Sequence, residues 1–266
     1  MVKILDTTLR EGEQAPGVYF DSHIKRGIAE MLDQVGVDII EAGHPAVSAD
    51  IKAAVSQISS LGTRAKIGAH ARSVRSDVDL ALDCGVQFLG IFYCVSDERL
   101  AHKDQSITQA IENIANTISY AKENHPGLTI RYTPEDTVRS RWENVVSASI
   151  EAVRAGADII SIADTTGYMI PGTGRNLYDF TLRFRDELAK QDLFPQIAIH
   201  CHNDRGLALA NAIDGYRAGA DIIDASVMGL GERAGIVDIA SLLAVLFNDF
   251  NDTGQRRLDI LPSLYS

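Results

Sequence analysis

Short apolar runs rich in β-branched residues alternate with longer segments of helical periodicity along the chain. The runs are KILDTTL, VDIIEAG, AKIGAHA, QFLGIFYCV, LTIRYTP, DIISIAD, IAIHCHN and DIIDASV, and the helical stretches between them include 24–35, 107–124, 139–155, 174–190 and 236–247. Eight strand-like runs, each followed by a helical stretch, predict parallel βα units. A doubly wound open sheet would alternate in the same way, but eight units in about 250 residues match a closed (β/α)8 TIM barrel better.

A weak internal repeat supports this prediction. GVDIIEAG at 36–43, GADIISIADTTG at 156–167 and GADIIDASVMG at 219–229 each join a helix end to a glycine, an aspartate and an apolar strand. The glycine suits a helix C-cap with positive φ, and the strand begins directly after it. Because no linker or low-complexity stretch interrupts the pattern, we expect a single TIM-barrel catalytic domain over residues 1–266.

Composition and charge exclude several classes of partner. Apolar residues make up 45% of the chain, and no run approaches the roughly 20 apolar residues that span a bilayer. The net charge of −11 disfavours nucleic acid and anionic membranes as partners. Cys84, Cys94 and Cys201 form no CxxC pair, which fits a reducing compartment. We therefore expect a cytoplasmic protein that acts on small molecules.

Polar and titratable residues collect where the apolar runs end. In a (β/α)8 barrel the active site lies at the C-terminal ends of the strands. The residues at these ends are Arg10 and Glu11; Glu41 and His44; His70 and Arg72; Tyr93 and Ser96; Arg131, Thr133 and Glu135; Asp164 and Thr165; His200, His202 and Asn203; and the loop from Gly229 to Gly235. The distribution predicts an active site at that end of the barrel.

HCHND at 200–204 is the sharpest local motif. Residues i and i+2 of a strand face the same way, so His200 and His202 project into one space. Two imidazoles and one carboxylate form a common divalent metal site. An isolated HxH is more often a pair of buried histidines that neighbouring groups satisfy. The position at the end of the seventh strand, with a carboxylate at the end of the first, favours the metal site.

The carboxylate that completes this site comes from the first strand. Asp6 lies within that strand and could orient Arg10, whereas Glu11 lies beyond Arg10 and has the longer reach. The alternative for Glu11 and Glu13 is a solvated loop that carries no function. Spacing alone does not decide between Asp6 and Glu11, although Glu11 has the better position.

Two further stretches point to anion binding. Arg131, Thr133 and Glu135 alternate along IRYTPED and share one face, and an inward arginine needs an anionic partner. That partner is either Glu135, in a structural ion pair, or a substrate carboxylate. His70 with Arg72 forms a second candidate carboxylate site, although Arg72 is equally plausible as a surface residue.

The loop GLGERAG at 229–235 follows the eighth strand. Loops in this place often bind anions through backbone N–H groups. The loop has no lysine and is not a P-loop. Glycine-rich loops are common, so this motif alone is a weak signal.

Taken together, DTTLREGEQAPG, YTPEDTVRS, ADTTG, HCHND and GLGERAG resemble the DRE-TIM metallolyase superfamily, and they occur in family order from residue 6 to 235. The chain is most similar to its Claisen-condensing branch, the homocitrate, 2-isopropylmalate and citramalate synthases. This resemblance implies a metal-dependent acyltransferase that condenses acetyl-CoA with a 2-oxo acid and then hydrolyses the thioester. The metal would be Mg, Mn or Zn.

The acceptor that the resemblance favours is a dicarboxylic 2-oxo acid such as 2-oxoglutarate. Glu11 in REGEQ and His70 both match homocitrate synthases. The alternatives are a 2-isopropylmalate or citramalate synthase-like condensation, a lyase or aldolase of the same superfamily, and a non-catalytic partner barrel of a two-subunit synthase. The cysteine-bearing loop typical of the HMG-CoA lyase branch is absent from the sequence.

The resemblance also implies roles for individual residues. Arg10 and Glu135 would be catalytic, and Glu11, His200 and His202 would bind the metal. The acceptor would contact Gln14, His70, Arg131, Thr133 and Thr165, and the acyl-CoA would contact Gly229, Gly231 and Glu232.

The sequence departs from the family pattern in two places. Ile236 stands where many relatives have asparagine. Condensing relatives continue beyond the position of Ser266 into a C-terminal subdomain, which supplies part of the acyl-CoA site and a histidine proposed as the base. The sequence therefore assigns no general base, and we expect either a homodimer or a partner subunit that carries that region.

Overall fold

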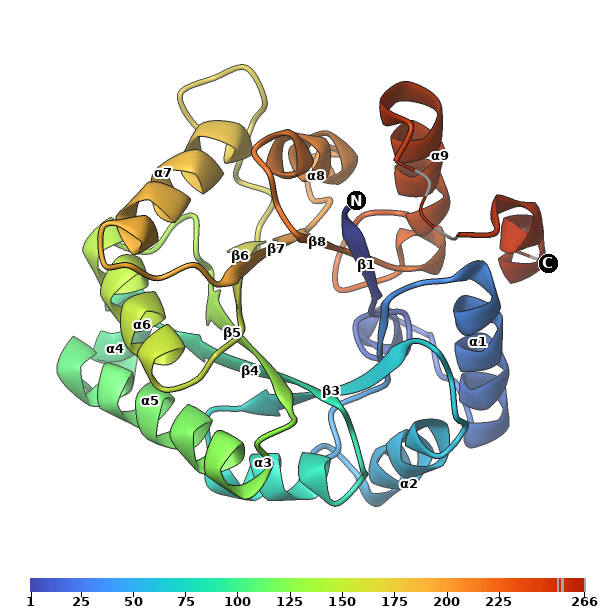
Figure 1. The fold of residues 1–266 in the computed structure, drawn as a ribbon, viewed down its shortest axis with the longest axis horizontal. Helices are drawn as coiled ribbons and strands as arrows, with labels where there is room; N and C mark the ends of the chain where they lie inside the picture. The colour runs from blue at the N-terminus through green and yellow to red at the C-terminus, as the bar shows by residue number, and fades with distance from the viewer. Residues whose placement is uncertain (253, 255, 266) are drawn as a thin grey trace.

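A computed structural model describes residues 1–252, 254 and 256–265. Its strands close into a parallel barrel in chain order, with β8 beside β1 (Figure 1). The predicted single-domain (β/α)8 barrel is confirmed. The strands are β1 Lys3–Asp6, β2 Ile39–Glu41, β3 Lys66–Arg72, β4 Phe88–Cys94, β5 Thr129–Glu135, β6 Ile159–Asp164, β7 Gln196–Cys201 and β8 Ile222–Ala225.

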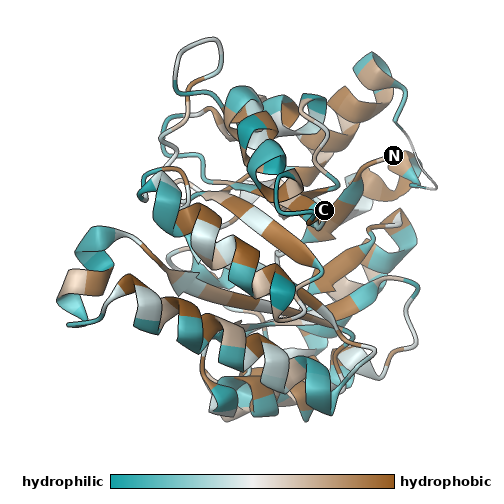
Figure 2. Ribbon diagram, turned by 60° about the vertical axis from the view of Figure 1, so that its left-hand side comes forward, coloured by the Kyte–Doolittle hydropathy of each residue, from teal (hydrophilic) through white to brown (hydrophobic). Residues whose placement is uncertain are grey.

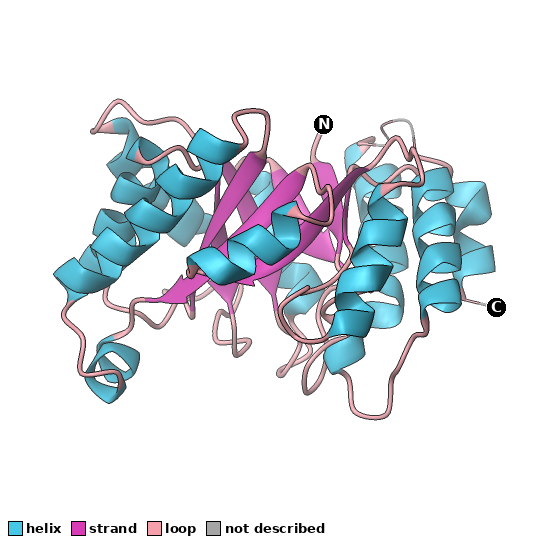
Figure 3. Ribbon diagram, turned by 90° about the horizontal axis from the view of Figure 1, so that it is seen from below, coloured by secondary structure: helices cyan, strands magenta, loops and turns pink. Residues whose placement is uncertain are grey.

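Helices surround the strands (Figure 3), and hydrophobic and hydrophilic residues alternate along them (Figure 2). The buried residues of these helices are mostly apolar. The five predicted helical stretches agree with the structure to within three residues at each end. None of the helices among the described residues is long and apolar enough to cross a membrane. The α-helices are α1 Ser22–Val35, α2 Ala49–Ser59, α3 Arg75–Leu82, α4 Asp97–His102, α5 Ile107–Asn124, α6 Trp142–Arg154, α7 Leu177–Ala189, α8 Ala208–Arg217 and α9 Ile239–Phe250, and the 3-10 helices are η1 Gly12–Gln14, η2 Val227–Gly229 and η3 Leu258–Leu264.

The Gly-x-Asp repeat forms the connections at the bottom of the barrel. Its glycines adopt positive φ, 90° at Gly36, 112° at Gly156 and 84° at Gly219. The aspartate carboxylates of Asp38, Asp158 and Asp221 accept the backbone N–H of Ile4, Ile130 and Ile197, each at 2.8 Å. The backbone N–H of each aspartate donates to the carbonyl of that same isoleucine. Each repeat thus ties the start of one strand to the strand before it.

The barrel interior is layered because strand side chains alternate between its two faces. The lower layer is an apolar floor made by Leu5, Ile39, Phe88, Ile159, Ala198 and Ile222. Two residues further along the chain from each of these lie Thr7, Glu41, Gly90, Ser161, His200 and Asp224. We call this set, together with His70 and Arg131 from β3 and β5, the charged layer. It lies above the floor, toward the C-terminal ends of the strands.

Two glycines leave the space that these layers need. A Cβ on Gly68 would lie 2.7 Å from the Phe88 ring, so only glycine admits Phe88 to the floor. A Cβ on Gly90 would lie 3.1 Å from His70 Nδ1 and 3.2 Å from Glu41 Oε1. Gly90 therefore makes room for the charged layer itself.

The first strand is shorter than the run KILDTTL suggested. It ends at Asp6, whose carboxylate accepts the backbone N–H and the hydroxyl of Thr8 and so turns the chain. The backbone N–H groups of Arg10 and Glu11 then donate to the carbonyl of Thr7. Arg10 and Glu11 consequently lie on a turn after the strand. Asp6 forms hydrogen bonds with Thr8. Among the described residues it forms none with Arg10, the partner that the sequence suggested.

Candidate active site

Glu41 is the centre of the charged layer. Its fully buried carboxylate accepts hydrogen bonds from Thr7 Oγ1 at 2.7 Å and Arg10 Nε at 2.6 Å, and from His70 Nδ1 and Arg131 Nη2 at 3.2 Å each. Burial alone would raise the pKa of Glu41, but the charge and hydrogen bonds of Arg10, His70 and Arg131 outweigh it and hold the pKa well below its usual range. Glu41 is therefore an ionised anchor for the groups around it.

Arg131 has partners that the sequence did not predict. Its Nη1 donates to both carboxylate oxygens of Asp224, at 2.9 and 2.8 Å, and its Nη2 donates to Glu41. Glu135, one of the two partners considered, pairs instead with Arg99 at 3.6 Å. Arg131 Nε is buried and has no hydrogen-bond partner among the described residues. The guanidinium is thus held by protein carboxylates on one side and keeps one donor free.

Glu11, His200 and His202 come together as the sequence analysis expected. Their ligand atoms lie within 4.8 Å of one another, and all three residues are buried. The Nε2 atoms of the two histidines are 3.2 Å apart. His200 Nδ1 lies 3.0 Å from Asp224 Oδ2. Asp224 already accepts two bonds from Arg131, so His200 Nδ1 carries the hydrogen and its Nε2 is left with a lone pair.

The protonation states of this group suit a divalent cation. Burial and the neighbouring His200 lower the pKa of His202 to about 3. Burial would raise the pKa of Glu11, but Arg10 and the two histidines lower it to about 2. Metal ligands must be deprotonated, and two imidazoles with one carboxylate are a common donor set for such ions. The residues therefore fit the divalent metal that the resemblance implies.

A cavity of about 190 Å³ opens above the charged layer. Its walls include every residue predicted to be catalytic, to bind the acceptor or to bind the metal, together with Glu232 from the predicted acyl-CoA set. The residues in the walls are Arg10, Glu11, Gln14, His44, His70, Phe92, Arg131, Thr133, Glu135, Ser161, Ala163, Thr165, His200, His202, Asp224 and Glu232. The sequence thus predicted most of the lining but attached no role to His44, Phe92, Ser161, Ala163 or Asp224.

Two hydroxyls in this cavity have no protein partner. Thr133 Oγ1 and Ser161 Oγ are buried without a hydrogen bond among the described residues. Thr165 Oγ1, by contrast, accepts the backbone N–H of Asp136 at 3.0 Å. An unpaired buried hydroxyl is costly unless a ligand or water completes it. Ser161 escaped notice because it lies inside an apolar run, although the alternation from Ile159 places it above the floor.

The GLGERAG loop lies against the metal-ligand group. The Glu232 N–H donates to Glu11 Oε1 at 3.2 Å, and a Cβ on Gly231 would lie 3.1 Å from Glu11 Cγ. Gly229 adopts a φ of 65°, and its carbonyl accepts the N–H of Ile236 at 2.9 Å. Gly229 and Gly231 do not line the 190 Å³ cavity. Their predicted contact with acyl-CoA stays a prediction.

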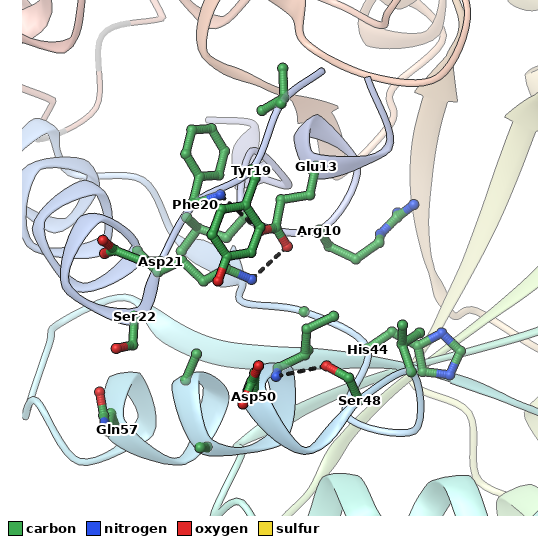
Figure 4. A pocket seen from close by; sticks show the side chains of 18 of the residues that line it. Arg10, Glu13, Tyr19, Phe20, Asp21, Ser22, His44, Ser48, Asp50 and Gln57 are labelled. Atoms are coloured by element: carbon green, nitrogen blue, oxygen red, sulfur yellow. Dashed lines mark hydrogen bonds and ion pairs between the residues drawn. The ribbon is translucent and has the colours of Figure 1, made fainter. Parts of the chain in front are cut away.

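A second cavity, of about 490 Å³, lies between the β1–α1 loop and helices α1 and α2 (Figure 4). It shares Arg10, Gln14 and His44 with the first cavity. Figure 4 shows Arg10 and His44 at one end of this space. With its amide nitrogen turned toward Glu11, Gln14 donates to both carboxylate oxygens, at 3.1 and 3.2 Å. The two cavities therefore meet beside the metal-ligand group.

Glu13 holds the loop between these cavities. Its carboxylate accepts the ammonium of the buried Lys25 at 2.5 Å and the backbone N–H of Phe20 at 3.1 Å. The solvated loop that the sequence allowed for Glu13 is therefore not what the structure shows.

Arg72 is a surface residue, which is one of the two alternatives that the sequence left open. Its side chain is 61% exposed and paired with Asp77.

Comparisons with known proteins agree with this geometry. The sequence model of the family described as HMGL-like matches residues 1–256. A homocitrate synthase from Pyrococcus horikoshii is 45% identical over 260 residues, which cover 97% of this chain and 68% of that protein. A homocitrate synthase from Saccharolobus islandicus is 43% identical over 250 residues, 92% of this chain and 52% of that protein. The chain thus spans between about half and about two thirds of these relatives.

A solved structure shares the same fold. The HMG-CoA lyase from Brucella melitensis superposes with a TM-score of 0.78 at 24% identity, over 99% of this chain and 95% of that one. This likeness supports the barrel and carries no information on the reaction. The predicted resemblance is confirmed by the family match and by the identity to curated relatives. The chain belongs to the HMGL-like family.

Proposed function

We propose that this protein condenses acetyl-CoA with a dicarboxylic 2-oxo acid, such as 2-oxoglutarate, in the manner of a homocitrate synthase. The class of enzyme, an acyltransferase, follows from relatives named homocitrate synthase at 43% to 45% identity. The acceptor and the metal dependence are proposals. The observation that carries them is the 190 Å³ cavity, in which a metal-ligand group lies beside Arg10, His70 and Arg131.

The residues divide the work as follows. Glu11, His200 and His202 would hold the divalent cation, which would supply Lewis-acid polarisation of the acceptor's keto group. Arg10 donates from Nε to Glu41 and from Nη1 to Glu11, so its guanidinium is fixed at the cavity wall. There it places positive charge where negative charge develops on the acceptor oxygen, an effect that is large in a buried site.

Formal charge links the cation to the acceptor. Glu135 and Glu232, in the same cavity walls, are each paired with an arginine that does not line the cavity, Arg99 and Arg233. In the remaining network of ion pairs, Arg10 and Arg131 give two positive formal charges, while Glu11, Glu41 and Asp224 give three negative ones, so the sum is −1. A divalent cation changes this sum to +1. Because a negative cavity repels an anion, we propose that the 2-oxo acid binds only after the metal.

His70 sets a condition on the second carboxylate of the acceptor. Burial and Arg10 lower the pKa of His70 to about 4, so the ring is neutral at neutral pH. Its Nδ1 donates to ionised Glu41, which leaves a lone pair on Nε2. A lone pair repels a carboxylate oxygen. A substrate carboxylate can therefore bind at Nε2 of His70 only if a proton lies between the two groups. We propose that a dicarboxylic acceptor binds with uptake of a proton.

The second cavity supports an entry route for acetyl-CoA. It has more than twice the volume of the first and joins it at Arg10, Gln14 and His44. A thioester arm in the 490 Å³ cavity would bring its acetyl group to the junction. The predicted homodimer or partner subunit and the cytoplasmic location stay predictions.

A panel of 2-oxo acids tests the proposed function. We expect thiol release from acetyl-CoA only with a divalent metal and a dicarboxylic member of the panel. Preference for a branched monocarboxylic acid would favour a 2-isopropylmalate type of condensation, and pyruvate would favour the citramalate type. Carbon–carbon cleavage of a hydroxy acid without CoA would favour a lyase. Absence of metal-dependent binding of every acid would refute the proposal.

A further inference from the structure

Ser161 places a hydroxyl among apolar neighbours on the wall of the 190 Å³ cavity. The residue is fully buried on β6, and its Oγ forms no hydrogen bond with any described residue. The neighbours that face inward with it on β6 are Ile159 and Ala163, and its register partner on β7 is Ala198. None of these side chains can donate or accept a hydrogen bond. A partner for the Ser161 hydroxyl must therefore come from the cavity itself.

Two buried groups on the neighbouring strand also lack a partner. Thr133 Oγ1 and Arg131 Nε, both on β5, form no hydrogen bond within the described part of the chain. Arg131 is paired with Ile159 in the β5–β6 register, and Thr133 and Ser161 occupy the next inward positions on the two strands. All three groups can donate a hydrogen bond, and the Nε–H can only donate. The ligand that completes them must offer several acceptor oxygens, as a carboxylate does.

These donors lie opposite the junction of the two cavities. Of the junction residues, Arg10 and Gln14 follow β1, and His44 follows β2. In a barrel that closes in chain order from β1 to β8, β5 and β6 lie across from β1 and β2. The keto group of the acceptor has to face the junction, because the acetyl group of the co-substrate would arrive there. The far end of the acceptor then points toward β5 and β6.

We propose that Ser161 is a specificity-determining residue, whose hydroxyl donates a hydrogen bond to the second carboxylate of the acceptor. This inference deepens the proposed condensation and rests on it. The resemblance implied contacts with Arg131 and Thr133 and gave Ser161 no role. A carboxylate has two oxygens, so one can share the proton with His70 Nε2 while the other accepts from Ser161. An acceptor that lacks the second carboxylate leaves the Ser161 hydroxyl without a partner.

Ser161→Ala tests this contact, and Ser149→Ala is the matched control. Ser149 is a fully buried serine on α6, its hydroxyl likewise has no partner among the described residues, and it lines neither cavity. Because neither substitution removes a hydrogen bond between described residues, chemical denaturation should show no loss of stability in either variant. Only the affinity for the acceptor should separate the two.

The affinity is measured by calorimetry on the Mn²⁺-loaded proteins with 2-oxoglutarate and with 2-oxopentanoate. The two acids have carbon chains of the same length and differ only in the second carboxylate. We expect Ser161→Ala to weaken the binding of 2-oxoglutarate by about 10-fold or more, and that of 2-oxopentanoate by less than about twofold, because only the former loses a hydrogen bond to a charged group. Ser149→Ala should match the wild type with both acids.

Two outcomes would overturn the inference. The first is an equal loss of affinity for the two acids, which would mean that Ser161 acts on the keto-acid end or on the fold. The second is an unchanged affinity of Ser161→Ala for 2-oxoglutarate, which would mean that water alone completes the hydroxyl. A wild-type protein that binds neither acid in the presence of Mn²⁺, or that binds both equally, would instead refute the proposed acceptor.

Discussion

The carboxylate of Asp224 contacts two functional residues. One is Arg131, which lines the acceptor cavity, and the other is His200, which belongs to the metal-ligand group. Sequence alternation placed His200 and His202 on one face, and the structure agrees. The same alternation could not predict the contacts of Asp224, because Asp224 lies 93 residues from Arg131 and 24 residues from His200 in the sequence. The contact with His200 joins the neighbouring strands β7 and β8, whereas the contact with Arg131 joins β8 to β5. Both depend on how the strands are arranged in the closed barrel, which a local sequence pattern does not reveal.

Asp224→Asn should weaken metal binding while the fold is kept. The amide cannot enforce the Nδ1–H form of His200, so Nε2 is less available to the metal. Loss of such a partner typically costs about 10- to 100-fold in metal affinity. Calorimetric titration of the metal-free protein with Mn²⁺ measures this directly. Asp221→Asn, on the same strand connection but remote from the metal-ligand group, is the control, and equal affinities in the two variants would refute the role of Asp224.

Binding of a dicarboxylic 2-oxo acid should become stronger as pH falls. The unliganded pKa of His70 is about 4, and a carboxylate at Nε2 raises it, so the complex holds more protons than the free protein. Affinity should then rise by up to about tenfold per unit between about pH 8 and pH 6. Glu11 and His202, with pKa values of about 2 and 3, do not titrate in this window.

Calorimetry in buffers of different ionisation enthalpy measures the proton uptake. A monocarboxylic 2-oxo acid and the variant His70→Gln serve as controls, and both should show a flatter profile. A dicarboxylic acid that binds without proton uptake would contradict the assignment of His70 to the second carboxylate.

At the scale of elements, periodicity predicted the barrel and five of its helices because both depend on local alternation. Periodicity predicted a longer β1 than the structure has. The turn at Asp6 depends on hydrogen bonds with Thr8, and a pattern of apolar residues does not reveal these bonds. The sequence did not predict the two layers of the barrel interior either. These layers depend on the register between strands, which places Gly90 beside His70 and Arg131.

Gly90→Ala should disturb the charged layer. The added methyl group would press on His70 and Glu41 at 3.1 and 3.2 Å, and overpacking of this kind costs about 1–3 kcal/mol of unfolding free energy. Chemical denaturation measures the loss, and 2-oxo acid affinity should fall with it.

Gly27→Ala on α1 is the matched control. No heavy atom lies within 4 Å of its added Cβ, so this variant should gain roughly 0.5–1 kcal/mol from the lower flexibility of the unfolded chain. Equal stabilities of the two variants would show that Gly90 has no packing role.

At the scale of the whole molecule, three buried carboxylates face the buried Arg131 and the partly buried Arg10, and this imbalance of charge couples the fold to its metal. A ligand that binds only the folded state raises the melting temperature with its concentration. Mn²⁺, Mg²⁺ or Zn²⁺ should therefore raise the Tm, and a chelator should reverse the effect. Thermal-shift measurements on His202→Ala should show no metal-dependent rise, and an unchanged rise would refute the proposed metal ligands.

The Gly-x-Asp repeat has a consequence for how the barrel can be divided. Asp38 ties β2 to β1, Asp158 ties β6 to β5, and Asp221 ties β8 to β7. None of these ties joins β4 to β5, so a break at 125–128 would leave all of them intact within one half or the other. The same holds for the connections between β2 and β3, between β3 and β4, and between β6 and β7, because none of the three ties joins these strands either. The chain could therefore be opened at any of these four connections, as in a circular permutant, without the loss of a repeat tie.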